Sequence, residues 1–222
     1  MTKPKEEGYR LLNYLGVAEE VQNMFSSVID EEPSGKLIFC YRDNSGEMVD
    51  KEHFTLKSFK PAASGIAVCS PSSRELVTDM FVSDSLMSLI AFCHFHFKRR
   101  SFRQVVFCST GLKPEKGLFL RYWKEYSKAK IHLLFGNSIL GRVLDCKLAH
   151  WVRGEDHSFY LNHSKIISSG LNEKSITIPR EGFSMRSYFR RLGGRNLVTT
   201  HKPSLKSIDN YINLLTHKTI QS

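Results

Sequence analysis

The chain has 222 residues, of which 41% are hydrophobic and 24% are charged, so it can bury the core of one large domain or two small ones. Lys and Arg outnumber Asp and Glu by 32 to 22, and the resulting net charge of +10 at pH 7 favours a polyanionic partner. The longest mostly apolar run, residues 86–97, is shorter than the about 20 residues that cross a bilayer. The first residues lack the apolar segment of a secretory signal. We therefore expect a cytoplasmic protein with no membrane partner.

Several kinds of cofactor site find no support in the sequence. The five cysteines are scattered without a C-x-x-C pair, which predicts buried reduced thiols rather than metal ligands. Neither G-x-x-x-x-G-K-[ST] nor G-x-G-x-x-G occurs, so no nucleotide-binding loop is predicted. We expect no cofactor.

The first part of the chain predicts two short helices followed by a β-hairpin. Apolar residues recur at helical spacing over residues 5–29, and Gly16 interrupts them. Residues 36–42 and 47–56 have the composition of strands, and residues 43–46 between them contain the Asn and Gly of a tight turn. These elements predict a small α+β region.

The boundary of this region is expected near residue 73. Residues 65–69 form a short extended segment, and the Ser-Pro-Ser-Ser that follows is typical of a loop. We therefore divide the chain into an N-terminal α+β region, residues 1–73, and an α/β domain with a basic C-terminal segment, residues 74–222.

Three strand–helix units follow and predict a mostly parallel sheet with helices on both faces. The predicted strands are residues 80–83, 104–109 and 130–135, and the predicted helices are residues 85–98, 114–126 and 139–152. Pro114 suits the first turn of its helix, and Ser138 suits a helix N-cap. Residues 158–162 are a candidate for a fourth strand. Ligands of such sheets bind at the carboxyl ends of the strands, so residues 83–85, 109–111 and 136–138 are the segments where a site is expected.

The third strand runs into a loop that lacks the acidic residues of a metal-dependent nucleic-acid enzyme. Such an enzyme would carry paired aspartates there, whereas this chain has Gly136 and Ser138, followed by Gly141 and Arg142. Mg²⁺ prefers carboxylate oxygens as ligands. Gly136 has no side chain to supply a ligand, and Ser138 could supply only one neutral oxygen. The first strand is followed by Asp84, which is either a weak metal ligand or a cap of the next helix.

Together these segments resemble a topoisomerase–primase (Toprim) domain of the primase-like kind found in plasmids and mobile elements. In that family the first strand ends in a glutamate, which Asp84 replaces here, and Ser88 stands where the helix would carry an aspartate. The family's Asp-x-Asp loop leading to Gly-Arg matches residues 136–142, with both acids missing. The small turn after the second strand matches residues 109–111, and residues 206–211 resemble a Lys-Asp-Trp-Asn segment. The similarity covers about residues 8–215.

The resemblance implies a Rossmann-like α/β sheet and a role in DNA replication, mobilisation or repair. The missing acids imply that the catalytic site is vestigial, with Asp84, Gly136 and Ser138 at its former positions, and that metal-dependent phosphoryl transfer has been lost. We predict no metal site, with Asp84 as the only weak candidate ligand.

Clustered basic residues favour contact with nucleic acid. Residues 163–222 contain 10 Lys and Arg against 3 Asp and Glu, and aromatic side chains lie among the arginines of residues 97–103 and 186–195. Guanidinium groups pair with phosphate, and aromatic rings stack on bases. The predicted nucleic-acid-binding residues are Lys98, Arg99, Arg100, Arg103, Arg142, Arg186, Arg190, Arg191 and Arg195.

Two alternatives remain at this stage. The fold could serve as a protein-interaction or structural module whose charge maintains solubility or attracts an acidic protein. It could also be an active Toprim nuclease or primase in which Asp79, Asp84 and Asp145 replace the missing acids and hold Mg²⁺. The second alternative requires these three carboxylates to converge. The sequence does not indicate an oligomeric state.

Overall fold

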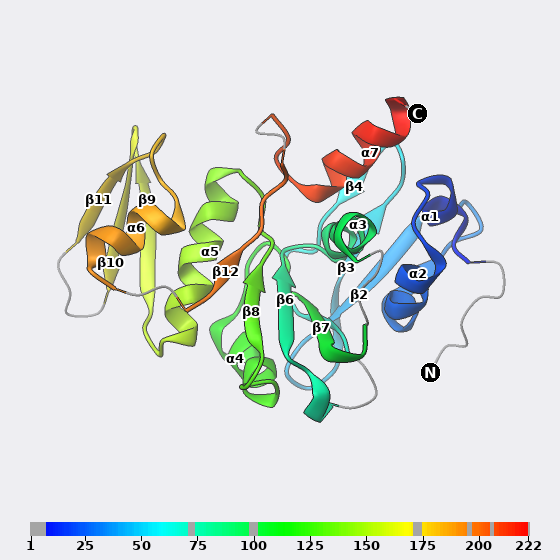
Figure 1. Cartoon of the computed structure of the whole chain (residues 1–222), viewed down its shortest axis with the longest axis horizontal. Coiled ribbons are helices and arrows are strands. Elements are labelled where there is room, and N and C mark those ends of the chain that lie inside the picture. The colour runs from blue at the N-terminus through cyan, green and yellow to red at the C-terminus, as the bar shows by residue number, and fades with distance from the viewer. Residues whose placement is uncertain are drawn as a thin grey trace.

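A computed structural model describes residues 8–70, 74–97, 102–170, 175–194, 197–204 and 207–221. Its central sheet has five strands in the order β12-β8-β6-β7-β5 (Figure 1). Strands β6, β7, β8 and β12 are parallel, and β5 runs antiparallel to β7. The strands are β5 (Ala67–Cys69), β6 (Asp79–Ser83), β7 (Val105–Ser109), β8 (Lys130–Leu133) and β12 (Thr199–Thr200). The predicted mostly parallel sheet is thus confirmed.

Helices cover both faces of this sheet, and its strands are therefore buried on both sides. In β6, Phe81 packs in the core that contains α3 (Leu86–His96) and α7 (Tyr211–Gln221). Its neighbours Met80 and Val82 pack in the core that contains α4 (Lys116–Glu125) and α5 (Ile139–Val152). This alternation follows the two-residue period of a strand. The three predicted strand–helix units are confirmed, except that Pro114 precedes the N-cap Glu115 of α4 instead of lying in its first turn.

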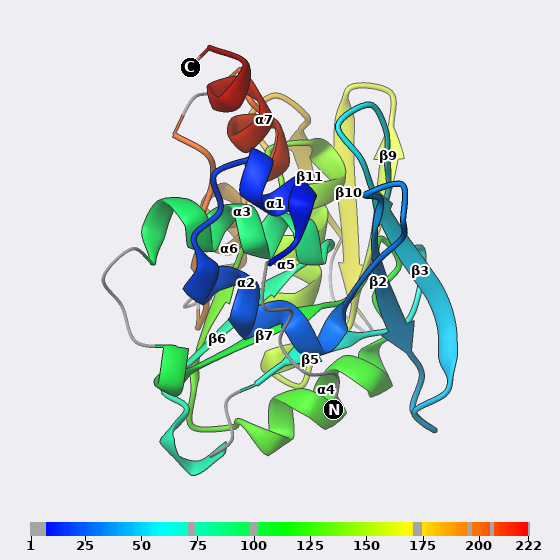
Figure 2. The same cartoon turned by 90° about the vertical axis from the view of Figure 1, so that its right-hand side faces the viewer.

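The N-terminal region packs over α3 and forms its own sheet. Helices α1 (Arg10–Tyr14) and α2 (Glu19–Phe25) are separated by Gly16, whose φ of +70° ends α1, and Figure 2 shows α1 in front of α3 and α2 below α3. The antiparallel sheet has the order β1-β2-β3-β4 and consists of β1 (Ile29–Glu31), β2 (Leu37–Arg42), β3 (Met48–Phe54) and β4 (Phe59–Lys60). The predicted hairpin of β2 and β3 is confirmed. Strand β5 precedes residue 73 and yet joins the central sheet, and the division at residue 73 stays a prediction.

A third, smaller sheet lies beside α5 at one end of the molecule (Figure 1). It has the antiparallel order β11-β10-β9, formed by β9 (His157–Asn162), β10 (Lys165–Gly170) and β11 (Ile176–Pro179), and α6 (Met185–Leu192) packs against β11. The expectation that residues 158–162 continue the parallel sheet is therefore wrong. Residues of β9 beyond His157 are mostly exposed, unlike a strand of a covered parallel sheet. The fourth parallel strand is β12, whose two residues show no periodicity.

None of the helices in the described ranges is both long enough and apolar enough to cross a membrane.

Candidate functional site

The carboxyl ends of β6, β7 and β8 meet at one edge of the central sheet, as parallel pairing requires. Leu134 N donates to Val82 O at 2.7 Å, and Thr110 N donates to Ser83 O at 2.9 Å. The Ser83 hydroxyl reaches Leu134 O at 3.4 Å. The turn that carries Asp84 therefore lies beside the turns after β7 and β8, and the three segments expected from the sequence form one edge.

Lys202 brings a positive charge to this edge. Its ammonium nitrogen lies 2.6 Å from Asp145 Oδ2, 2.6 Å from Phe135 O and 3.0 Å from Gly136 O. Burial raises the pKa of Asp145 to about 7, and the Lys202 ammonium acts against that rise. Burial also raises the pKa of Asp84, and the Lys202 charge partly offsets it. One ammonium thus contacts one carboxyl group and two main-chain carbonyls, and its charge also acts on the Asp84 carboxyl.

Gly136 lies against another part of the chain, which explains why no side chain occurs there. A Cβ atom at Gly136 would stand 2.7 Å from the main-chain oxygen of Asp209. The adjacent Asn137 holds the same segment, because its N–H donates to Asp209 O at 2.6 Å and its side chain donates to Ile208 O at 3.1 Å. The main chain at residues 208–209 therefore packs where a carboxylate at position 136 would begin.

The loop then turns tightly into α5. Ser138 caps this helix, as predicted, since its hydroxyl accepts from Gly141 N at 3.1 Å. A Cβ atom at Gly141 would stand 2.3 Å from Gly136 O, so the loop and the first turn of the helix touch through main-chain atoms. The glycine of the Gly-Arg pair that follows the loop therefore has a steric reason that does not depend on a metal.

These residues do not fit the Mg²⁺ ion that the Toprim resemblance implies. Asp145 Oδ2 and the main-chain carbonyls of Phe135 and Gly136 already accept hydrogen bonds from the Lys202 ammonium. Gly136 has no side chain that could supply a further ligand. Asp79 does not join Asp84 and Asp145. It lies at the other end of β6, where its Oδ1 is 2.8 Å from His132 Nε2. The convergence of three acids that an active site would require is absent from the described residues, which corrects that alternative.

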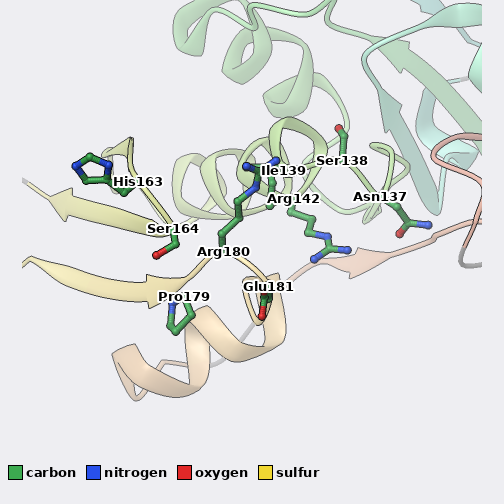
Figure 3. Close-up of a pocket in the computed structure, with 9 residues that line it drawn as sticks. All are labelled: Asn137, Ser138, Ile139, Arg142, His163, Ser164, Pro179, Arg180 and Glu181. Atoms are coloured by element: carbon green, nitrogen blue, oxygen red, sulfur yellow. The ribbon is translucent and has the colours of Figure 1, made fainter.

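A cleft of about 860 Å³ opens between the start of α5 and the small sheet (Figure 3). The residues that line it are Asn137, Ser138, Ile139, Arg142, His163, Ser164, Pro179, Arg180 and Glu181. The Arg180 side chain extends from the end of β11 toward the first turn of α5 in Figure 3. Arg142 lies beside it and donates to Phe183 O at 3.0 Å. Both arginines line the cleft together with Ser138, the N-cap of α5, and the positive end of a helix dipole also attracts anions.

Of the predicted basic residues that the structure describes, only Arg142 lines this cleft. Arg186, Arg190 and Arg191 are exposed on α6. Arg103 lies just before β7, at the opposite edge of the sheet. Lys98, Arg99, Arg100 and Arg195 lie outside the described residues. Sequence reasoning missed Arg180, His163 and Lys202, and the excess of basic residues after residue 163 was the signal that could have pointed to Arg180 and Lys202.

Comparisons with known proteins give structural likenesses only. No family model and no curated protein matches the chain. The chain is similar to the crystal structure of the primase fragment of the bacteriophage T7 primase-helicase protein, with 16% identity and a TM-score of 0.42 over 68% of this chain and 64% of that chain. It thus spans less than two thirds of that fragment. It is also similar to a chain in a structure of the bacteriophage T7 lagging-strand DNA polymerase interacting with primase domains bound to an RNA/DNA hybrid and dTTP, with 15% identity and a TM-score of 0.36 over 61% of this chain and 70% of that one.

A second polar cluster lies between α5, β9 and α6. His150 contacts Glu155 Oε2 through Nδ1 at 2.6 Å and the Tyr188 hydroxyl through Nε2 at 2.9 Å. His150, Glu155 and His157 have ligand atoms close enough to share a metal ion. However, the two imidazole rings stack at 3.7 Å with only 14° between their planes, so their in-plane lone pairs do not converge. Arg153 also binds Glu155 at 3.0 Å. We interpret the cluster as a hydrogen-bonded part of the core.

This interpretation predicts a pH-dependent stability. Burial lowers the pKa of His150 despite its Glu155 partner. His150 therefore takes up a proton at a higher pH in the unfolded chain than in the folded chain, and its contribution to the free energy of unfolding falls as the pH drops below the ordinary histidine range. His150→Phe should remove this pH dependence and destabilise the chain by about 2 kcal/mol at neutral pH, because Tyr188 and Glu155 lose a partner.

Urea denaturation between about pH 5 and pH 7 measures the effect. Tyr188→Phe is the matched control, since it removes one hydroxyl and leaves His150 buried, so the pH dependence should persist. Equal pH profiles for the wild type and His150→Phe would contradict the interpretation.

A third polar group, the buried carboxyl of Glu52 in β3, anchors the start of α3. It accepts hydrogen bonds from the Tyr41 hydroxyl at 2.7 Å, from Ser85 Oγ at 2.9 Å, and from the main-chain N–H groups of Leu86 and Met87 at 3.1 and 2.9 Å. Because Ser85 follows Asp84 directly, Glu52 holds the turn after β6 in place. Burial raises the pKa of Glu52 to about 7. No short motif marks this residue, and sequence reasoning missed it.

Proposed function

We propose that this chain is a Toprim-like protein that binds nucleic acid through the cleft at the start of α5 and catalyses no metal-dependent phosphoryl transfer. Arg142 and Arg180, which face the cleft beside the N-terminus of a 14-residue helix, carry the proposal. Glu181 is the only acidic side chain among the lining residues given above. The order of motifs in the sequence supports the Toprim assignment, with a role in DNA replication, mobilisation or repair.

The balance of charge at the strand ends supports binding without a metal. In a metal-dependent site the carboxylates repel phosphate until a divalent cation binds. Here the Lys202 ammonium lies within 2.6 Å of Asp145 and acts on Asp84 as well. Phosphate can therefore approach the neighbouring arginines without first recruiting a cation.

Fluorescence anisotropy with labelled single-stranded DNA, duplex DNA and RNA tests the proposal. We expect wild-type binding at about 50 mM salt that weakens steeply as salt is added, because phosphate contacts release counterions. Arg180→Glu should weaken binding about tenfold and reduce the salt dependence, whereas a chelator should have no effect. Arg180 is exposed, so this variant should fold normally.

Lys128→Glu is the matched control because it makes the same change of charge at an exposed position. Lys128 precedes β8 and so lies at the edge of the sheet opposite the cleft. The affinity of the Lys128→Glu variant for nucleic acid should stay near that of the wild type. Absence of wild-type binding at low salt, or equal losses in the two variants, would refute the proposal.

A protein-interaction module is the second candidate function, and one observation favours it. A groove of about 510 Å³ between α1 and the β3–β4 turn exposes Tyr14 and Leu56, which are 65% and 51% accessible. Exposed apolar side chains that lie together are typical of docking surfaces. The anisotropy titration separates the two functions, because a protein-interaction module would leave the anisotropy of the labelled DNA and RNA unchanged.

A further inference from the structure

Lys202 is bound at the strand ends in the manner of a coordinated cation. An ammonium group has three hydrogens, and three oxygen atoms surround this one within 3.0 Å: Asp145 Oδ2, Phe135 O and Gly136 O. Two are main-chain carbonyls and one is a carboxylate, which are the kinds of oxygen that hard cations also bind. All hydrogen-bond donors of the group are thereby used.

The acidic side chains here need a cation. The Asp145 side chain is only 1% accessible, and its Oδ1 atom has no hydrogen-bond partner among the described residues. A buried carboxylate without a nearby positive charge is strongly unfavourable. The neighbouring Asp84 adds to the cost, since its charge further raises the pKa of Asp145.

The main chain fixes the position of Lys202. Strand β12 pairs in parallel with β8 through Thr200 and Leu133, and His201 N donates to Leu133 O at 2.8 Å. The next residue, Lys202, therefore stands beside residues 135–136, at the level where the neighbouring strands end. Pairing of the two strands delivers the ammonium to the carboxyl groups as part of folding.

We propose that the Lys202 ammonium is the resident cation of this site and that it excludes divalent metal ions from the Asp84 and Asp145 carboxyl groups. Removing the ammonium would take the bonded cation from the Asp145 carboxyl and two carbonyl oxygens, with the Asp84 charge nearby and the Arg142 charge still acting on Asp145. This set of oxygens suits Mg²⁺ or Mn²⁺. The inference goes beyond nucleic-acid binding, and a metal titration without nucleic acid tests it separately.

Isothermal titration calorimetry with MnCl₂ provides the test. The titration is made at about pH 8, above the pKa of about 7 that burial gives the Asp145 carboxyl in the wild type. We expect wild type and Lys128→Ala to bind Mn²⁺ no tighter than about 1 mM, and Lys202→Ala to bind at least about tenfold tighter. Adding Asp145→Asn to Lys202→Ala should abolish the gain.

Two results would overturn the inference. The first is a Lys202→Ala variant that keeps the wild-type circular dichroism spectrum and binds Mn²⁺ no tighter than the wild type. The second is wild-type binding in the micromolar range that Asp145→Asn removes.

A measurement on the wild-type chain keeps the inference falsifiable if Lys202→Ala fails to fold. Acetylation by a soluble anhydride, followed by mass spectrometry, should modify Lys202 about tenfold more slowly than the exposed Lys128, because all hydrogens of the Lys202 ammonium are engaged. Addition of about 10 mM Mg²⁺ should not change the rate. Equal rates at Lys202 and Lys128, or a faster reaction of Lys202 with Mg²⁺, would show that the ammonium is not held as the resident cation.

Discussion

Gly141→Ala is expected to lower the free energy of unfolding by about 2 kcal/mol, although alanine is the better helix former. The added Cβ would stand 2.3 Å from Gly136 O and 2.8 Å from Gly136 N. These are main-chain atoms, which cannot rotate away as a flexible side chain would. Overpacking of this kind costs about 1–3 kcal/mol or more, whereas the gain in helix propensity is only about 1 kcal/mol. The steric term should therefore dominate.

Gly117→Ala supplies the matched control, because Gly117 also lies in the first turn of a helix. The nearest atom to its added Cβ is Glu115 Oε1 at 3.8 Å, an ordinary contact. This variant should be more stable than the wild type by about 0.5–1 kcal/mol. Urea denaturation of both variants gives the comparison, and effects of the same sign would contradict the close approach of loop and helix.

Gly141→Ala also tests the contacts at the carboxyl ends of the strands. The carbonyl of Gly136 accepts from Lys202 and is also the atom that the Gly141 Cβ would meet first. If the loop shifts to admit the methyl group, the contact between Gly136 and Lys202 should lengthen. Acetylation of Lys202 should then be faster in Gly141→Ala than in Gly117→Ala.

Local signals account for the parts of the fold that the sequence predicts well. Helix α5 has the predicted bounds, residues 139–152, because its apolar period and the Ser138 cap are encoded within a few residues. The hairpin of β2 and β3 follows in the same way from its turn residues. Strand β9 was misassigned because a short apolar segment does not reveal which sheet it joins, and the antiparallel pairing with β10 decides that question.

The candidate site was predicted only where it depends on strand ends. Order along the chain placed Asp84 and Gly136 at one edge, which agrees with the parallel register of β6 and β8. It did not indicate Lys202, because β12 has two residues and its pairing partner β8 lies more than 60 residues earlier. Nor did it indicate why position 136 is a glycine, since Asp209, whose carbonyl packs there, is 73 residues away. Contacts between distant segments leave no periodic trace in a single sequence.

Glu52→Ala should have the largest effect on stability, a loss of about 4 kcal/mol at about pH 5. Four donors would lose their acceptor, and each unsatisfied buried donor costs about 1–3 kcal/mol, partly relieved by rearrangement. The side chain is fully buried, so a cavity adds to the loss. The same change should loosen the turn that carries Asp84, because Glu52 binds Ser85 Oγ and the main-chain N–H groups that follow it.

The effect of Glu52→Ala should shrink as the pH rises. The pKa of Glu52 is raised from 4.5 to about 7 by burial, so between these values the folded chain holds a proton that the unfolded chain has lost. The contribution of Glu52 to the wild-type free energy of unfolding therefore falls with rising pH across this window, and the variant lacks this contribution. Urea denaturation at about pH 5 and about pH 8 measures the difference. Glu47→Ala, an exposed change in the same hairpin, should stay within about 0.5 kcal/mol of the wild type at both pH values. A Glu52→Ala loss no larger than that of Glu47→Ala would show that the carboxyl of Glu52 does not hold α3 and the strand-end turn together.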